Sequence, residues 1–523
     1  MKKLFKAMQV HMLGLAMLFG LAACQKVDTA NDGTAAADSA KPVFTILAGS
    51  ELKDIEPLVK AFGESKGVAV KFDYSGSLDA IDKLSEANNY DAAWVSHGKY
   101  LQLIPQVQSQ IKASEKTMYS RVVFGVKPEK MRELGWKSGK TTWQDIVAAA
   151  KAGKFHFAMT NPSGSNTGFV ALVGLATELS GKGDALTESD IPAGKLKELF
   201  AGQSMTSGSS GVLAEQFQAN PQGADGMVNY ESIIKTVSRK VPLEVLVPKE
   251  GVITADYPLM LLAKSKQQPF YAQLVEHLRS EATQKQIAQS TFRTPLAGDG
   301  SDEVVNELPF PGSVKVVDAI LRGFLDEYSR PASSFFVLDV SDSMQGERLA
   351  DMKRSMTALA QGDGSVSGRF STFRNREKVY ITSFSNDVQP AKLFSLSADT
   401  AANQAALAQV ASTVNSLHTD GGTAIYDALK SVYATAQAEL KAGGRSVSIV
   451  LFTDGENNSG IGPREFLALV DQQGSPRVPI HTILYGEGNS GEMNALASAT
   501  GGKTFDARTV SLKKVMKTIR AFQ

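Results

Sequence analysis

The sequence has 523 residues but a single cysteine, so no disulfide bond can form within the chain. A structural zinc site built on several cysteines is excluded for the same reason. Neither sign of charge is in excess, because 55 Lys and Arg residues are balanced by 54 Asp and Glu residues, for a net charge of +1. Non-specific nucleic-acid binding needs a basic surface, and we therefore expect no nucleic-acid partner.

Recognisable catalytic motifs are also lacking. The six histidines do not have the spacing of a metalloprotease, and the sequence contains no G-x-S-x-G elbow, no phosphate loop and no dinucleotide fingerprint in context. After the N-terminal segment no run reaches 18 uninterrupted apolar residues, so no membrane-spanning helix is expected there. With 43% hydrophobic residues the chain can bury a sizeable core. These absences favour a folded binding protein over an enzyme.

The first 23 residues have the pattern of a secretory signal peptide. Lysines precede an apolar run of about 12 residues, too short to cross a bilayer, and small residues follow. The segment ends in Leu21-Ala22-Ala23-Cys24, which resembles the bacterial lipoprotein signal. That resemblance implies that Cys24 becomes the lipidated N-terminus, and Gln25 in place of Asp favours the periplasmic face of the outer membrane if the cell is Gram-negative. The alternative is an ordinary buried cysteine in a signal remnant.

The next segment, 24–41, is small and polar, and we interpret it as a flexible tether. From 42 to 298 apolar strand-like runs alternate with helical runs, which predicts an α/β fold with a parallel sheet. Ligands bind beyond the carboxyl ends of such strands. Ser50, Ser77 and Thr167 each fall between a predicted strand and a predicted helix.

The order of several short motifs resembles the two-lobed periplasmic substrate-binding proteins, in particular the molybdate- and sulfate-type receptors. The motifs are ILAGS at 46–50, YSGS at 74–77, NPSGSNTG at 161–168, VNYES at 228–232, ADYPLMLL at 255–262 and TFRTP at 291–295. The resemblance implies a cleft between two lobes that takes a small solute, lined by Ser50, Ser77 and Thr167.

Two observations count against an oxyanion held by these hydroxyls. Ser50 and Ser77 are also placed to act only as helix N-caps, the commonest role of serine at such positions. Glu51, Asp54 and Asp79 lie close by, and carboxylates facing the cleft would repel an anion.

Residues 299–331 begin with a polar break and continue with apolar residues at helical spacing. We interpret them as a connector helix that packs on a domain, because its apolar stripe needs cover.

Residues 332–523 contain SSFFVLDVSDSM, then GGTAIYDAL, then VSIVLFTDG, in that order. This pattern resembles the von Willebrand factor A domain, a doubly wound, Rossmann-like α/β fold with a metal-ion-dependent adhesion site. The resemblance implies a metal site at Asp339, Ser341, Ser343, Thr423 and Asp454. The hydroxyls of Ser341, Ser343 and Thr423 would coordinate directly, and Asp339 and Asp454 mostly through water.

Hydroxyl and carboxylate oxygens suit a hard cation, namely Mg²⁺, or else Ca²⁺ or Mn²⁺. Two carboxylates incompletely neutralise a dication whose direct ligands are neutral, so a partner protein is expected to supply a further acidic residue. The alternative makes Asp339 and the serines a helix cap and Asp454 part of a turn. Asp342, where many relatives have glycine, adds a carboxylate beside the site.

Together these features predict a lipid-anchored, extracytoplasmic binding protein. A solute-binding-like module would share one membrane anchor with a domain for metal-dependent protein interaction. The alternative function is a solute receptor that delivers a small ligand to an ABC-type transporter.

Overall fold

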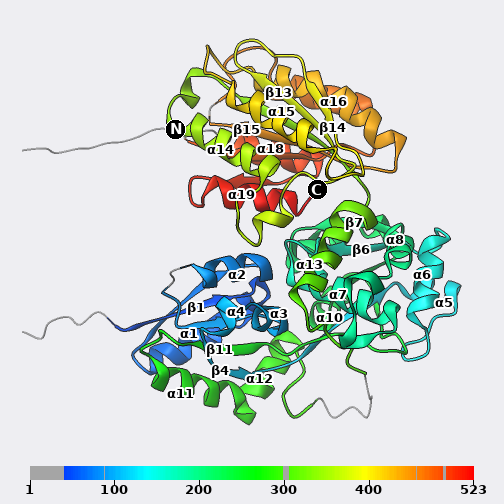
Figure 1. Cartoon of the computed structure of the whole chain (residues 1–523), viewed down its shortest axis with the longest axis vertical. Coiled ribbons are helices and arrows are strands. Elements are labelled where there is room, and N and C mark those ends of the chain that lie inside the picture. The colour runs from blue at the N-terminus through cyan, green and yellow to red at the C-terminus, as the bar shows by residue number, and fades with distance from the viewer. Residues whose placement is uncertain (1–40, 87–88, 299–305, 455, 487–489) are drawn as a thin grey trace, which may run out of the picture. The chain divides into compact units, whose positions relative to one another are not determined.

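The computed structural model of the chain describes residues 41–86, 89–298, 306–454, 456–486 and 490–523. The predicted signal peptide, Cys24 and all of the predicted tether except Lys41 lie outside the described residues. Residues Pro42–Gln523 form one compact unit (Figure 1). Within the described ranges, no helix combines the length and the apolarity needed to cross a bilayer.

The first lobe is built on a mixed sheet in the order β2-β1-β3-β11-β4. Its strands are β1 (Val43–Ala48), β2 (Ala69–Tyr74), β3 (Ala92–Trp94), β4 (Ile111–Lys116) and β11 (Pro258–Leu262). The first three are parallel, as the sequence predicts, whereas β11 runs antiparallel to both β3 and β4. The predicted parallel sheet is therefore mixed here, because β11 enters this sheet from the other lobe in the opposite direction.

The helices of the first lobe connect these strands or follow β11. They are α1 (Glu56–Ser65), α2 (Ser77–Ser85), α3 (Lys99–Leu103), α4 (Pro105–Gln108), α11 (Gln268–Arg279) and α12 (Glu281–Thr291).

The second lobe has a sheet in the order β10-β5-β8-β6-β7, with β9 paired to β5. Its strands are β5 (Ser120–Val126), β6 (Phe157–Thr160), β7 (Gln203–Ser207), β8 (Gly226–Tyr230), β9 (Glu244–Leu246) and β10 (Thr254–Ala255). Its helices are α5 (Pro128–Leu134), α6 (Trp143–Lys151), α7 (Asn166–Ser180), α8 (Ala193–Phe200), α9 (Ser210–Ala219) and α10 (Glu231–Val237). The buried apolar residues of the two lobes belong to one cluster, so the lobes share a continuous core.

The predicted connector helix is α13 (Val314–Gly323), which continues into a π-helical turn at Phe324–Tyr328. Its apolar residues Val316, Val317 and Ile320 are buried in the cluster of the two-lobed module. The Phe324 ring meets the Phe200 ring edge-on, with centroids 4.9 Å apart. The connector therefore packs on a domain, because its apolar stripe is covered there.

The C-terminal domain is a six-stranded sheet in the order β14-β13-β12-β15-β16-β17. Its strands are β12 (Ala332–Asp339), β13 (Lys378–Phe384), β14 (Lys392–Ser395), β15 (Ser446–Thr453), β16 (Ile480–Leu484) and β17 (Thr504–Asp506). All pairings are parallel except that of β13 with β14. Every residue of β12 is buried, as expected for a central parallel strand covered on both faces.

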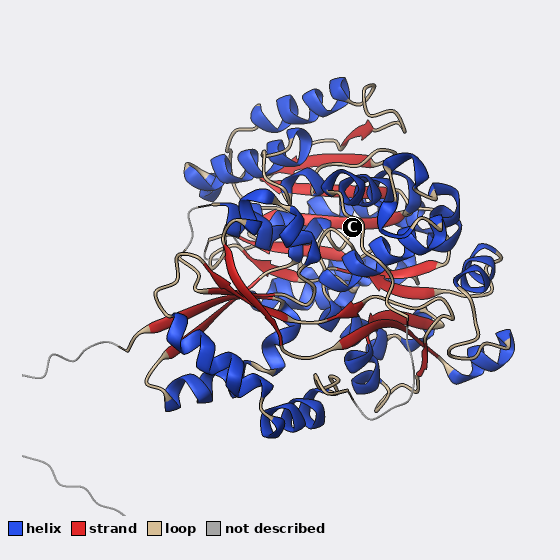
Figure 2. Cartoon of the chain, turned by 60° about the horizontal axis from the view of Figure 1, so that its bottom comes forward, coloured by secondary structure: helices blue, strands red, loops and turns tan. Residues whose placement is uncertain are grey.

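Helices lie over the strands of this sheet (Figure 2). One apolar cluster joins the sheet to α14 (Glu347–Gln361), α15 (Gln404–Asn415) and α19 (Leu512–Arg520). A second cluster joins it to α16 (Ile425–Ala442), α17 (Pro463–Gln473) and α18 (Ser490–Thr500). The domain is therefore the doubly wound α/β fold that the sequence predicts.

The loop after α14 contacts the two-lobed module within the same compact unit. Asp82 of α2 accepts hydrogen bonds from the backbone N–H of Val366, at 2.6 Å, and of Ser367, at 3.0 Å. Phe370 packs in the apolar cluster of the two-lobed module.

Candidate functional site

The carboxyl edge of the C-terminal sheet brings together side chains from separate parts of the sequence. Asp339 ends β12, and Asp454 follows β15, which pairs with β12 in parallel. Parallel neighbours end at the same edge of a sheet, which places both carboxylates there. Both residues are buried, and the Ser343 hydroxyl donates to Asp454 Oδ1 at 2.7 Å.

Asp339 receives hydrogen bonds on both carboxylate oxygens. The Ser341 N–H and hydroxyl donate to Oδ1 at 2.9 and 2.6 Å, and the Thr453 hydroxyl donates to Oδ2 at 2.7 Å. Burial raises the pKa of Asp339 to about 6, although these hydrogen bonds act in the opposite direction. The Ser341 and Ser343 hydroxyl oxygens are 3.0 Å apart. Each of these hydroxyls donates its single proton to a carboxylate, Ser341 to Asp339 and Ser343 to Asp454, so the two hydroxyl oxygens face each other with no proton left to share.

Thr423 is held near this edge through its backbone. It is buried just before α16, and its N–H donates to Asn458 Oδ1 at 2.8 Å, while the Asn458 N–H donates to the Thr423 carbonyl at 3.0 Å. The Asp342 N–H donates to the Gly421 carbonyl at 2.9 Å. These bonds join the loop that carries Thr423 to the loops that carry Ser343 and Asp454.

The donor set at this edge fits a hard divalent cation. It consists of hydroxyl and carboxylate oxygens, which Mg²⁺, Ca²⁺ and Mn²⁺ prefer. In the described part of the chain no three His, Cys, Asp or Glu side chains gather as a metal cluster. A cation at this edge therefore depends on the hydroxyl groups as well as on the two carboxylates.

Sequence reasoning missed two residues at this edge. Arg348, in the first turn of α14, forms an ion pair with Asp454 Oδ2. Asn458 binds the backbone of Thr423 on both sides, as described above. Two features of the sequence could have pointed to these residues. Arg348 stands at the start of the helix after D-x-S-x-S, and Asn458 stands shortly after Asp454.

A groove of about 480 Å³ adjoins this edge of the C-terminal sheet. It lies between the β13–β14 hairpin and the end of α15, and its lining includes Val340, Ser385, Asp387, His418 and Asp420. His418 is exposed there.

In the two-lobed module, Ser77 and Asn166 connect the lobes. The Ser77 hydroxyl, on α2 of the first lobe, donates to Asn166 Oδ1, on α7 of the second lobe, and both residues are buried. Asn166 Nδ2 lies 3.4 Å from Glu51 Oε1. Burial raises the pKa of Glu51, and this contact acts against that rise. The hydroxyl predicted to hold a solute is therefore engaged in a contact between the lobes.

The hydroxyls of Thr167 and Ser50, also predicted to line the cleft, differ in burial and in hydrogen bonding. Thr167 is buried and its hydroxyl is hydrogen-bonded to that of Ser210, so this pair lies within the second lobe. Ser50 is exposed, on a 3₁₀ turn. The capping alternative does not hold for Ser50 or Ser77, because Gly49 and Gly76 occupy the N-cap positions and no side chain caps either helix.

Three other hydroxyls, which sequence reasoning missed, are buried at strand ends. They belong to Ser75 after β2, Thr160 at the end of β6 and Ser207 at the end of β7. Their oxygens have no hydrogen-bond partner among the described residues. Buried hydroxyls are normally paired, so these three are candidates for contact with a ligand. Their position at the carboxyl ends of predicted strands could have identified them from the sequence.

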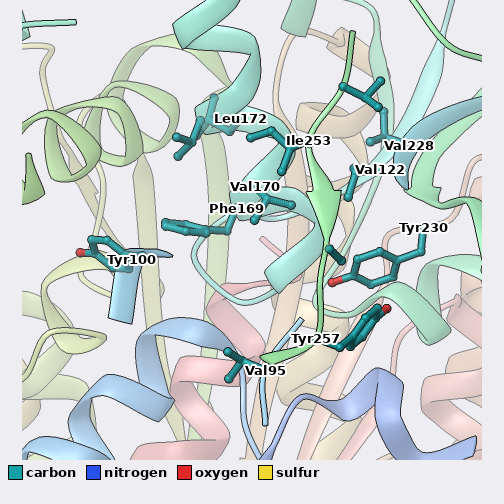
Figure 3. Packing of buried hydrophobic residues seen from close by; sticks show 14 of the residues in the cluster. Val95, Tyr100, Val122, Phe169, Val170, Leu172, Val228, Tyr230, Ile253 and Tyr257 are labelled. Atoms are coloured by element: carbon teal, nitrogen blue, oxygen red, sulfur yellow. The ribbon is translucent and has the colours of Figure 1, made fainter. Parts of the chain in front are cut away.

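The carboxylates near Ser50 are partly compensated by Arg293 of the TFRTP motif. Its Nη1 donates to Asp54 Oδ2 and its Nη2 to the Glu51 carbonyl, both at 2.7 Å. The guanidinium also lies 5.0 Å from the centre of the Tyr257 ring. Tyr230 lies beside Tyr257, with ring centroids 6.1 Å apart (Figure 3). The junction between the lobes is thus polar and aromatic as well as acidic.

Two family models match the chain in consecutive segments. The model of the bacterial extracellular solute-binding protein matches residues 44–293, and that of the von Willebrand factor type A domain matches residues 335–518. The chain joins a solute-binding module to a von Willebrand factor A domain. The predicted resemblances to the solute-binding proteins and to the von Willebrand factor A domain are confirmed. No curated protein matches the sequence.

Solved periplasmic binding proteins are similar to the two-lobed module. The periplasmic binding protein AfuA from Actinobacillus pleuropneumoniae is 16% identical, with a TM-score of 0.43, over 55% of this chain and 99% of that chain. A periplasmic thiamin binding protein is 14% identical, with a TM-score of 0.44, over 55% of this chain and 98% of that chain.

Proposed function

We propose that the chain is an extracytoplasmic binding protein that couples a solute-binding module to metal-dependent protein interaction. The observation that carries this proposal is the close set of oxygen atoms that Asp339, Ser341, Ser343 and Asp454 bring together at one sheet edge. Such an array of oxygen atoms is suited to hold a cation, which supports a role in binding.

In this proposal Ser341, Ser343 and Thr423 hold Mg²⁺, or else Ca²⁺ or Mn²⁺, directly, and Asp339 and Asp454 act through water. The ion supplies a positive site for an acidic side chain of a partner protein. The adjoining groove of about 480 Å³ offers room for further contacts with that partner.

Calorimetric titration of the full chain with Mg²⁺ and Mn²⁺ tests the metal site. Asp339→Asn keeps the shape of the side chain but removes its charge, and we expect it to weaken metal binding by at least about 100-fold, or about 2.7 kcal/mol. Asp399→Asn, at an exposed position, is the matched control and should bind like the wild type. Equal binding by wild type and Asp339→Asn would contradict the site. A partner that stays bound in chelator would contradict the adhesion mechanism alone.

The buried, unpaired hydroxyls of Ser75, Thr160 and Ser207 favour a second candidate function, a solute receptor for an ABC-type transporter. They come from both lobes, as a ligand enclosed between the lobes requires. A thermal-shift screen of oxyanions, sugars and amino acids tests it. A ligand at 100 times its dissociation constant should stabilise the protein by about 2.7 kcal/mol. If no compound produces a shift, the module acts as an interaction domain without a solute.

We further propose that Cys24 anchors the protein by lipid to the cell envelope, facing the periplasm from the outer membrane in a Gram-negative cell. The support is the Leu21-Ala22-Ala23-Cys24 sequence. Cys24→Ser should abolish incorporation of labelled fatty acid and leave the protein soluble or unprocessed. Normal labelling of this variant would contradict the anchor.

A further inference from the structure

Arg348 lies at the proposed metal site although it cannot be a metal ligand. It belongs to the first turn of α14, directly after the loop that carries Ser341 and Ser343. Its Nη1 forms an ion pair with Asp454 Oδ2 and donates to the Ser343 carbonyl at 3.0 Å. We propose that the Arg348 guanidinium competes with the divalent cation for Asp454 and so sets the metal affinity of this domain. This inference rests on the proposed metal site.

The two partners of this ion pair differ in exposure. The Asp454 side chain is 0% exposed, whereas that of Arg348 is 38% exposed. A buried carboxylate without a nearby positive charge is costly, and Arg348 supplies that charge. Because the arginine side chain is long and partly exposed, it can turn toward solvent without unfolding of the helix.

The backbone next to the pair leaves room for the guanidinium. A Cβ atom on Gly486 would lie 3.0 Å from Arg348 Cζ and 3.1 Å from Asp454 Cβ. Gly486 also has φ +88°, a conformation that residues with a side chain rarely adopt. A glycine at this position therefore allows Arg348 to lie over Asp454.

A divalent cation and this guanidinium exclude each other at close range. Both carry positive charge and both are drawn to the Asp454 carboxylate. Ser343 lies between them, because its hydroxyl donates to Asp454 and its carbonyl accepts from Arg348. Repulsion between like charges is strong in a site that is partly shielded from water. Metal binding then requires Arg348 to leave Asp454.

The test compares metal affinity and metal-free stability in the full chain. Calorimetric titration with Mg²⁺ or Mn²⁺ alone should give about tenfold tighter binding for Arg348→Gln than for wild type, equivalent to about 1.4 kcal/mol. In chelator the same variant should melt at a lower temperature, because Asp454 loses its counter-charge. Arg348→Lys keeps the charge on a shorter group and should bind metal with intermediate affinity. This second variant keeps the test usable if Arg348→Gln does not fold.

Arg354→Gln is the matched control for net charge. Arg354 lies on the same helix, about 9 Å further along its axis, and pairs with Glu347 and Asp351. This variant should bind metal like the wild type.

The possible outcomes separate this inference from the proposed function. Equal or weaker metal binding by Arg348→Gln than by wild type would overturn the competition and leave the metal site standing. A lower melting temperature with unchanged affinity would show a purely structural role, which also overturns it. Absence of metal binding in every protein tested would overturn the metal site and this inference together.

Discussion

The carboxyl edge of the von Willebrand domain, where we propose a metal site and which we call the metal edge, and the junction between the two lobes both contain hydroxyl groups, but these groups are used differently. At the metal edge, the Ser341 and Ser343 hydroxyl oxygens lie 3.0 Å apart, and each hydroxyl donates to a carboxylate at the end of a neighbouring strand. At the junction, Ser77 bonds to Asn166 of the opposite lobe. Hydroxyls at the ends of strands can therefore either form a binding site or hold two lobes together.

The difference lies in where the partners come from. Each partner at the metal edge lies at the end of a strand in one sheet, so the strand order fixes the contacts. The partners at the junction lie in different lobes, and their contacts change whenever the lobes move. We therefore expect the metal edge to be rigid, while the contacts at the junction depend on ligand and on lobe closure.

The largest effect that we expect is a loss of stability in acid, caused by one buried histidine in the two-lobed module and one in the von Willebrand domain. Burial lowers the pKa of His97 in the two-lobed module to about 3 and that of His481 in the von Willebrand domain to about 4. The unfolded chain takes up these protons as the pH falls below about 6.5, whereas the folded chain stays neutral. Stability is therefore full above pH 6.5 and falls as the pH decreases toward these lowered values.

The loss is at most about 5 kcal/mol through His97 and about 3 kcal/mol through His481. Denaturation in urea at pH 7.5 and at pH 5 measures the first part of this loss, about 2 kcal/mol through each histidine, because both lowered pKa values lie below pH 5. His97→Gln and His481→Gln should each reduce the difference between the two pH values. The exposed His418→Gln should leave it unchanged, and an equally large reduction in that variant would contradict the assignment.

The second prediction concerns the contact between the lobes. Asn166→Ala removes the partner of the Ser77 hydroxyl and leaves Glu51 with one contact fewer. We expect the free energy of unfolding to fall by about 2 to 3 kcal/mol and the lobes to lie further apart, because buried polar groups lose their partners. Fluorescent labels on cysteines introduced at Lys60 and Lys151, in a Cys24→Ser background, would report the separation. Asn415→Ala, exposed on α15, is the control, and an unchanged separation in Asn166→Ala would exclude a role in closure.

Much of the metal edge could be predicted from sequence because its parts are local or fixed by topology. Asp339, Ser341 and Ser343 lie within five residues, and Asp454 directly follows a strand whose neighbour in a parallel sheet is β12. The position of Arg348 at the start of the helix is visible in the sequence, but its contact with Asp454 is not, because that contact depends on how the first turn of α14 is oriented above Asp454. The free space at Gly486 is likewise visible only in three dimensions.

The junction could be predicted less well. The alternating strands and helices indicate two lobes, but the partner of Ser77 is 89 residues away in the sequence and lies in the other lobe. Which hydroxyls remain unpaired depends on the residues across the junction. Sequence reasoning therefore selected Ser77 and Thr167, which are already paired, and missed Ser75, Thr160 and Ser207. The antiparallel β11 was missed because it enters the first sheet from the second lobe.

The third prediction compares two serines within one motif. Ser77→Ala should cost about 1 to 2 kcal/mol, since Asn166 loses a buried hydrogen bond. Ser75→Ala should change stability by less than about 0.5 kcal/mol, because its hydroxyl has no partner among the described residues. Ser75→Ala should nevertheless weaken any solute found in the screen. Equal costs for the two variants would remove the distinction between paired and free hydroxyls.

The smallest effect concerns Thr423, where the roles of backbone and side chain separate. Its backbone N–H and carbonyl are both held by Asn458, so replacement of the side chain should leave the loop in place. Thr423→Val keeps the shape and removes only the hydroxyl. We expect the free energy of unfolding to change by less than about 0.5 kcal/mol. Mg²⁺ binding should weaken about fivefold, or by about 1 kcal/mol. Thr423→Ser restores a hydroxyl and should bind Mg²⁺ like the wild type. If Thr423→Val and Thr423→Ser bind equally well, Thr423 is not a ligand, and the metal depends on Ser341, Ser343 and the two carboxylates alone.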